Sequence, residues 1–379
     1  MGPLAGIKVV EIASLAPAPM GTTILADLGA DVIVIDRPGG TRGGAGSAPG
    51  NPLRRNRRSI TLDLKKPEAI EVLLQLCEKA DVFVEGFRPG VTERLGIGPE
   101  DLAARNPGLV YARMTGWGQD GPLAQTAGHD IDYIAMSGVL HMLGPAGGKP
   151  AFPSNLVGDF GGGGMLMALG ILAALVERAT SGKGQVVDAA MVDGAAQLGN
   201  FMFGMRGAGQ WPNPRGENML DGAAPFYDTY ECADGGYVAV GAIEPQFYAQ
   251  LLEGLGIDPE SLPDQHDQAR WPEVKAKFGA AFAAQPRAHW EEVFDGTDAC
   301  VSPILSPDEA FVHPANTARG VFTEVDGVTQ AVGAPRFSRT PSDPPTSGPD
   351  NGANSEEILA ELGMTAEQIA NVRQAGVLG

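Results

Sequence analysis

Apolar, β-rich segments alternate with helical segments over the first 190 residues, and this alternation constrains the fold most strongly. Strands are predicted at residues 8–13, 31–36, 81–85, 109–114 and 185–191. Helices are predicted at residues 19–28, 67–79, 99–106 and from glycines 161–164 to about residue 177. Continuously apolar strands separated by helices are typical of a parallel sheet covered on both faces. We therefore predict an α/β fold with a Rossmann-like large domain at residues 1–200.

The pattern changes after about residue 220. Two hairpins are predicted, at residues 227–243 and 321–332, each with an Asp-Gly turn. Helices are predicted near residues 245–255, 272–285 and 287–295. Together these elements predict a smaller α+β domain at residues 220–335. Residues 336–379 are expected to form a linker, at 338–355, and two short helices that return to the large domain.

Net charge and cysteine content limit the partners and the compartment. The 379 residues carry a net charge of −19, which disfavours nucleic acid and anionic membranes as partners. Three widely spaced cysteines give no disulfide or zinc pattern, and no signal peptide is evident, so we expect a cytoplasmic protein. We expect Cys300 to be buried among its apolar neighbours. The apolar stretch 165–176 is too short to span a bilayer and predicts a buried helix.

Four arginines, Arg54, Arg55, Arg57 and Arg58, lie within five residues. They could form a solvated surface, but guanidinium groups match phosphate in a bidentate fork, so a polyanionic ligand is favoured. Further arginines are predicted in loops after strands, where open α/β sheets bind ligands: Arg37, Arg42, Arg88 and Arg94. The ligand predicted from this pattern carries several phosphates.

A dinucleotide cofactor is disfavoured. Asp36 closes the second predicted strand, where a ribose-binding acid would stand, but the first turn, residues 15–19, has no glycine. The one G-x-G-x-x-G match, at residues 116–121, is followed by Pro122 rather than by a helix, which the motif requires.

One of only five histidines, His129, stands in the segment Gly-His-Asp-Ile-Asp-Tyr, and Asp159 precedes the glycine run 161–164. Alone, His129 could be structural and Asp159 could cap a helix. Together they form a candidate acid–base pair. The predicted helix start at residue 161 could stabilise an oxyanion. Its dipole would lower the pKa of Asp159 whereas burial by Phe160 would raise it, and the sequence leaves this balance open.

The chain resembles the class III CoA-transferase superfamily and, within it, the α-methylacyl-CoA racemases. The resemblance covers nearly the whole length and rests on the segments LAGIKVVEIASLAPAPMGTTILADLGADVIVIDRPG, RRSITLDLKKPE, DVFVEGFRPGVTERLGIGPEDL, GHDIDYIAMSGVL, GDFGGGGMLMALGILAAL, GQVVDAAMVDG and GAIEPQF. Several of these belong to the superfamily at large, whereas GHDIDY and the Glu-Pro-Gln-Phe stretch point to the racemase branch.

The resemblance implies a set of site residues. Those that would bind the CoA ester are Arg37, Leu62, Asp63, Leu64, Lys65, Arg88, Arg94, Gly128, Asp130, Ile131, Asp132 and Tyr133. His129 and Asp159 would flank the substrate α-carbon, and Glu244 would orient the histidine. The implied assembly is an interlocked homodimer in which Glu244 could act on the partner's His129.

The implied reaction is epimerisation of (R)- and (S)-2-methylacyl-CoA thioesters at C2 through an enolate. His129 would serve the S-substrate and Asp159 the R-substrate, with no metal or cofactor, because CoA belongs to the substrate. A class III CoA-transferase using Asp159 as nucleophile is the main alternative. A non-catalytic acyl-CoA binding protein is the second. Sterol side chains, branched fatty acids and aryl-propionates all fit the same α-carbon logic, so a role in lipid or fatty acid metabolism is expected with the acyl chain left open.

Overall fold

The computed structural model describes residues 2–39, 50–212 and 214–378. The chain forms two compact units. The first comprises Met1–Ser137, Pro153–Gly199 and Ala315–Gly379, and the second comprises Gly138–Phe152 and Asn200–Pro314. The first unit therefore contains the C-terminal segment and also the hairpin that the sequence analysis placed in the smaller domain.

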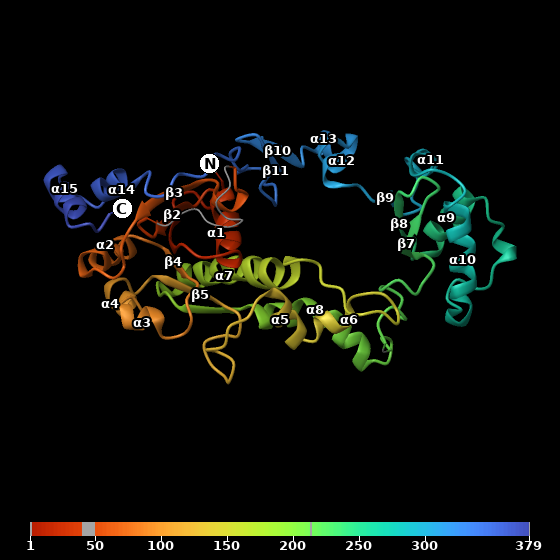
Figure 1. Cartoon of the computed structure of the whole chain (residues 1–379), viewed down its shortest axis with the longest axis horizontal. Coiled ribbons are helices and arrows are strands. Elements are labelled where there is room, and N and C mark those ends of the chain that lie inside the picture. The colour runs from red at the N-terminus through yellow and green to blue at the C-terminus, as the bar shows by residue number, and fades with distance from the viewer. Residues whose placement is uncertain (1, 40–49, 213, 379) are drawn as a thin grey trace. The chain divides into compact units, whose positions relative to one another are not determined.

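A six-stranded parallel sheet forms the centre of the first unit (Figure 1). Its order is β3-β2-β1-β4-β5-β6, the order of Rossmann folds. The strands are β1 Lys8–Ile12, β2 Asp31–Asp36, β3 Arg57–Thr61, β4 Val82–Glu85, β5 Val110–Thr115 and β6 Val186–Ala190. The predicted Rossmann-like α/β fold is confirmed.

The sequence pattern does not predict strand β3. It reads Arg-Arg-Ser-Ile-Thr and begins with two residues of the arginine cluster, so it lacks the apolar run that marks the other strands. It pairs in parallel with β2, from Val32 opposite Arg57 to Asp36 opposite Thr61. Two charged residues can begin this strand because acidic side chains compensate them, as described below.

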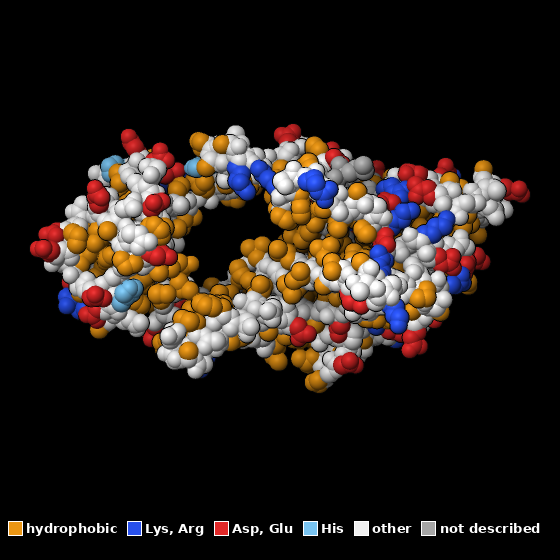
Figure 2. Space-filling view, turned by 180° about the vertical axis from the view of Figure 1, so that it is seen from behind, with side chains coloured by type: hydrophobic (Ala, Val, Ile, Leu, Met, Phe, Trp, Pro, Cys, Tyr) orange, Lys and Arg blue, Asp and Glu red, His pale blue; other side chains and the backbone are white. Residues whose placement is uncertain are grey.

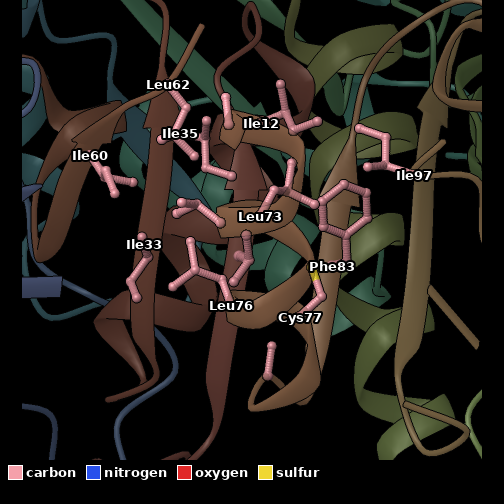
Figure 3. Close-up of a cluster of buried hydrophobic side chains, with 14 of the residues drawn as sticks. Ile12, Ile33, Ile35, Ile60, Leu62, Leu73, Leu76, Cys77, Phe83 and Ile97 are labelled. Carbon is pink, nitrogen blue, oxygen red and sulfur yellow. The ribbon is translucent and has the colours of Figure 1, made fainter. Parts of the chain in front are cut away.

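Helices cover both faces of the sheet. On one face, α2 Pro67–Glu78, α4 Pro99–Arg105 and α14 Ser355–Glu361 enclose a core of branched side chains (Figure 3). On the other face, α1 Pro17–Asp27 and α7 Leu166–Ser181 enclose a second core. The first unit also contains α3 Val91–Leu95, α5 Asp130–Met136, the hairpin β10 Phe322–Val325 and β11 Val328–Ala331, and α15 Ala366–Gln374.

A π-helix at Leu156–Met165 leads directly into α7 and contains the glycine run. The glycines let it pack closely between α1 and α8, which spans Met191–Gly207. A Cβ on Gly194 would lie 1.8 Å from the Gly162 carbonyl oxygen, and one on Gly164 would lie 2.6 Å from the Pro17 carbonyl oxygen. The glycine run is therefore a helix-packing feature.

One side of α7 is apolar and exposed. Leu169 and Val176 are 60% and 73% exposed, whereas Met167 and Ile171 are fully buried against the sheet. The stretch 165–176 is helical as expected, but the helix is longer than expected and only one side of it is buried. In the described part of the chain, Leu156–Ser181 is the one helix whose length and composition would suffice to cross a membrane, a property that core helices of soluble proteins share. Figure 2 shows apolar side chains exposed among scattered acidic ones.

The second unit is built on a three-stranded antiparallel sheet, in the order β7-β8-β9. These strands span Tyr227–Glu231, Tyr237–Gly241 and Val301–Pro303. The helices of this unit are α6 Val139–Met142, α9 Pro245–Leu255, α10 Trp271–Phe282, α11 Arg287–Phe294 and α12 Pro307–Val312, and α13 Pro314–Arg319 joins it to the first unit. Aromatic side chains dominate its core, with Phe226, Phe278 and Phe282 fully buried.

Candidate active site

The carboxyl ends of the parallel strands bring several predicted binding segments to one edge of the sheet. Arg37 directly follows β2, and the segment 62–65 follows β3. Arg88 lies three residues beyond the end of β4. Ligands of open α/β sheets bind at this edge. Arg42 lies outside the described residues.

The arginine cluster is structural, so the expectation that it binds a polyanion was wrong. Each of its four guanidinium groups pairs with a carboxylate: Arg54 with Asp36 at 2.8 Å, Arg55 with Asp27, Arg57 with Glu11 and Arg58 with Asp31, each at 2.6 Å. The side chains of Arg57 and Glu11 are 2% and 0% exposed. The pairing also occupies Asp36, the residue that a dinucleotide ribose would need.

In the segment 62–65, which follows β3, the first side chain is buried in the core and the last is exposed. Leu62 is 1% exposed, and its side chain belongs to the core of Figure 3. A ligand could therefore meet Leu62 only through its main chain. The Asp63 side chain accepts a hydrogen bond from the Lys65 amide at 3.3 Å, Leu64 packs partly against the core, and Lys65 is exposed.

A buried ion-pair network underlies the loop that carries Arg88. The Glu85 carboxylate, fully buried at the end of β4, accepts the Phe87 N–H at 2.6 Å. Arg113 on β5 bridges Glu85 and Glu93 of α3, at 2.8 Å each. This network fixes the chain between β4 and α3, where Arg88 is exposed, and it also fixes α3, where Arg94 is exposed.

His129 immediately precedes α5 and is exposed. The backbone N–H of His129 donates a hydrogen bond to the Asp132 carboxylate at 2.9 Å. The Tyr133 hydroxyl donates to the Gly128 carbonyl at 2.5 Å, and a Cβ on Gly128 would lie 2.7 Å from the Tyr133 ring. The Tyr133 ring also meets Trp117 edge to face at 4.8 Å between centroids. These contacts fix the peptide that carries the imidazole, and Ile131 is 40% exposed on the same turn.

Asp159 lies in the π-helix with a half-buried carboxyl group. Burial raises its pKa, and the charge of Asp130 raises it further, whereas a hydrogen bond from Asn155 at 3.3 Å and the charge of His129 lower it. The net shift is upward. Burial raises the pKa of Tyr133 to about 12, and the negative charges of Asp159 and Asp132 contribute to this rise. The structure thus brings Asp159 into electrostatic contact with His129, Asp130 and Tyr133.

The helix near Asp159 begins at Leu156 rather than at residue 161. The amide groups of Gly161–Gly164 lie inside this helix, and i to i−5 hydrogen bonding is already present where the Phe160 N–H donates to Asn155. The expected oxyanion site at residue 161 was therefore wrong, and the pKa of Asp159 is raised with burial as the largest cause.

Glu244 belongs to the second unit. It is exposed, and its carbonyl accepts the amide groups of Phe247 and Tyr248 at the start of α9. Its charge raises the pKa of Cys300, as does burial, the larger cause. Cys300 itself is exposed, so the expectation that it would be buried was wrong.

Sequence reasoning missed Glu85, Arg113 and Asn155. Glu85 and Arg113 lie within otherwise apolar strands. Charged residues at such positions indicate buried charges that are paired with opposite charges. Asn155 precedes the helix by one residue and carried no such signal. In the described residues, no group of three or more His, Cys, Asp or Glu side chains could hold a metal ion.

The fold and this site define the class of protein, an α/β enzyme with a Rossmann-like large unit. Residues 4–355 match the family model of CoA-transferase family III, and the chain belongs to that family. It is 48% identical to the alpha-methylacyl-CoA racemases of Mus musculus and Homo sapiens, over 97% of this chain and 95% of each relative. It is 34% identical to the acetyl-CoA:oxalate CoA-transferase of Acetobacter aceti, over 86% of this chain and 87% of that protein.

Solved structures agree in fold. A CAIB/BAIF family protein from Brucella suis superposes with a TM-score of 0.81 at 28% identity, covering 95% of this chain and 99% of that one.

Proposed function

We propose that this protein is a racemase that interconverts (R)- and (S)-2-methylacyl-CoA thioesters by proton transfer at C2. The observation that supports the proposal is the electrostatic interaction of His129 with a half-buried Asp159 whose pKa is raised. The near full-length similarity to proteins named alpha-methylacyl-CoA racemase supports the same reaction. An imidazole and a carboxyl group are the two bases that such a reaction needs.

The chemistry follows from the substrate. A thioester acidifies its α-proton because the carbanion is delocalised onto the carbonyl oxygen. In the proposed reaction His129 removes the proton from the S-substrate, and protonated Asp159 returns one to the opposite face. The roles reverse for the R-substrate. A raised pKa makes Asp159 a stronger base and a more available acid than an ordinary carboxyl, and general acid–base catalysis of this kind is worth ~10²–10⁴ in rate.

The CoA moiety would bind at the carboxyl edge of the sheet. Arg37, Lys65, Arg88 and Arg94 are exposed there and supply positive charge for its phosphates. Gly128, Asp132 and the neighbouring residues of the α5 start would contact the thioester end. The reaction as proposed uses no metal or added cofactor, because CoA is part of the substrate.

Exchange of the α-hydrogen in D₂O tests the proposal. The wild-type protein should incorporate deuterium at C2 of a 2-methylacyl-CoA while it racemises. His129→Ala and Asp159→Ala should each lower racemisation by ~10²–10⁴. The matched control is Asp193→Asn, which removes an exposed carboxylate on α8 and should leave the rate unchanged. Full activity of either active-site variant would contradict the assignment.

The family also contains CoA-transferases, so a second function is tested in parallel. In that reaction Asp159 attacks the acyl-CoA, CoA leaves as a thiolate, and the anhydride is then converted to an aspartyl-CoA thioester. Hydroxylamine would trap this intermediate, and turnover would require a free-acid acceptor. Binding of acyl-CoA with neither exchange nor transfer would identify a binding protein instead.

We further propose a cytoplasmic homodimer in which the two chains interlock and Glu244 orients the His129 of the partner. The exposed apolar side of α7 supports association, since soluble monomers rarely expose large apolar patches.

A further inference from the structure

The side chain of Asp130 is 6% exposed, although it follows the exposed His129 directly. Its Oδ2 accepts the Asp159 N–H at 2.7 Å. A Cβ on Gly158 would lie 2.6 Å from the same oxygen, so only glycine at this position lets the carboxylate reach the backbone. The Asp130 side chain therefore connects the start of α5 to the π-helix. It thereby links the segment that contains His129 to the segment that contains Asp159.

The other oxygen, Oδ1, is buried without a hydrogen-bond partner in the described residues. A buried carboxylate with half of its acceptor capacity unused costs free energy of folding. An amide would make the same bond to the Asp159 N–H without burying a charge. Stability alone therefore does not explain a carboxylate at this position, whereas an effect of its charge on the adjacent carboxyl of Asp159 does.

We propose that Asp130 is a positioning residue that fixes Asp159 relative to His129 through its backbone hydrogen bond and places a buried negative charge near the Asp159 carboxyl. This inference rests on the proposed racemase function. The charged groups that act on Asp159 are Asp130 and His129, and Asp159 acts in turn on Tyr133, all three from the α5 segment. Helices α1 and α8 meet the π-helix through the uncharged Pro17, Gly21, Gly194 and Ala195.

Two substitutions separate the two effects. Asp130→Asn keeps an acceptor for the Asp159 N–H but removes the charge, so the pKa of Asp159 should fall. With the R-substrate, for which Asp159 is the base, the acid limb of kcat/KM should move to lower pH. Asp130→Ala removes the bond as well, and kcat should fall by ~10² with little change in KM, because misplacement of a reacting group costs about that much.

The measurements are deuterium exchange from the R- and S-substrates separately, across pH, with thermal unfolding of each variant. Asp193→Asn again serves as the charge-removal control. An Asp130→Asn profile that superimposes on the wild-type profile would overturn the inference, as would wild-type kcat in a folded Asp130→Ala. If Asp130→Ala does not fold, the pH profile of Asp130→Asn alone still tests the inference. Absence of exchange in the wild-type protein would instead refute the racemase function itself.

Discussion

At the scale of single residues, the environment of Asp159 determines what the site can do. A carboxylate is a useful base towards a weak carbon acid only when its charged form is poorly stabilised. Burial and the charge of Asp130 provide this condition at Asp159, whereas a hydrogen bond from Asn155 and the charge of His129 oppose it. Because the opposing bond comes from a single half-buried side chain four residues before Asp159, one substitution removes it.

Asn155→Ala removes a hydrogen bond that lowers the pKa of Asp159, so that pKa should rise. The acid limb of kcat/KM for the R-substrate should then move to higher pH, since the base must be deprotonated and now loses its proton only at higher pH. The pH dependence of deuterium exchange measures this shift. A limb that stays in place or moves to lower pH would contradict the assignment of Asp159 as this base.

The residues of the site differ in how far sequence alone could find them. His129 and Asp159 stood out as a rare histidine and an acid in glycine-rich segments, but only the structure shows that they interact. The arginine cluster gave a wrong prediction of a polyanion site because a local charge pattern does not show which residues pair with it. Asp27 and Glu11, which are distant in sequence, supply two of the compensating carboxylates. Pairing across such separations depends on the tertiary fold, which no local pattern specifies.

At the scale of elements, the close packing of the π-helix places Asp159. Apolar runs predicted five of the six strands, and four of these, β1, β2, β4 and β5, are almost entirely buried, which leaves a strong local signal. Strand β3 and the π-helix left none, since their formation depends on ion pairs and on backbone contact between helices. Glycines at 161–164 and at Gly194 serve this contact, which sets the depth at which Asp159 lies.

Gly194→Ala should destabilise the protein by about 3 kcal/mol or more, because the new methyl group would lie 1.8 Å from the Gly162 carbonyl oxygen and force α8 away from the π-helix. Gly204→Ala is the matched control in the same helix. It meets nothing within 4 Å and should stabilise by ~0.5–1 kcal/mol through helix propensity. Urea unfolding compares the two. Equal stability of both variants would contradict the packing role of the glycines.

At the scale of the whole molecule, the first unit exposes an apolar surface along one helix. Leu169 and Val176 on α7, and Met165 directly before it, are more than half exposed, whereas the other side of α7 is packed on the sheet. The acidic net charge of −19 opposes non-specific association but does not cover an apolar face. A second copy of the chain would cover it, consistent with the proposed dimer.

Replacing Leu169 and Val176 by Asp should convert a dimer into monomers, because each charge would have to be buried in the apolar contact. Sedimentation velocity measures the change. Ala104→Asp is the control, an exposed position on α4 across the sheet, and should leave the dimer intact. A double variant that sediments as the wild-type protein does would show that α7 does not form the interface.

Subunit complementation tests whether Glu244 acts across the dimer. The variants His129→Ala and Glu244→Ala should each be nearly inactive as homodimers, since each removes one member of the proposed histidine–glutamate pair. If Glu244 orients the partner's histidine, a heterodimer of the two variants contains one site with both residues intact and one with neither. Co-expressed and isolated heterodimers should then regain about half of the wild-type exchange rate, because sites of known composition contribute independently. If Glu244 serves the histidine of its own chain, every site in the heterodimer lacks one of the two, and activity stays as low as in the homodimers. The two arrangements therefore predict opposite results from the same pair of single substitutions.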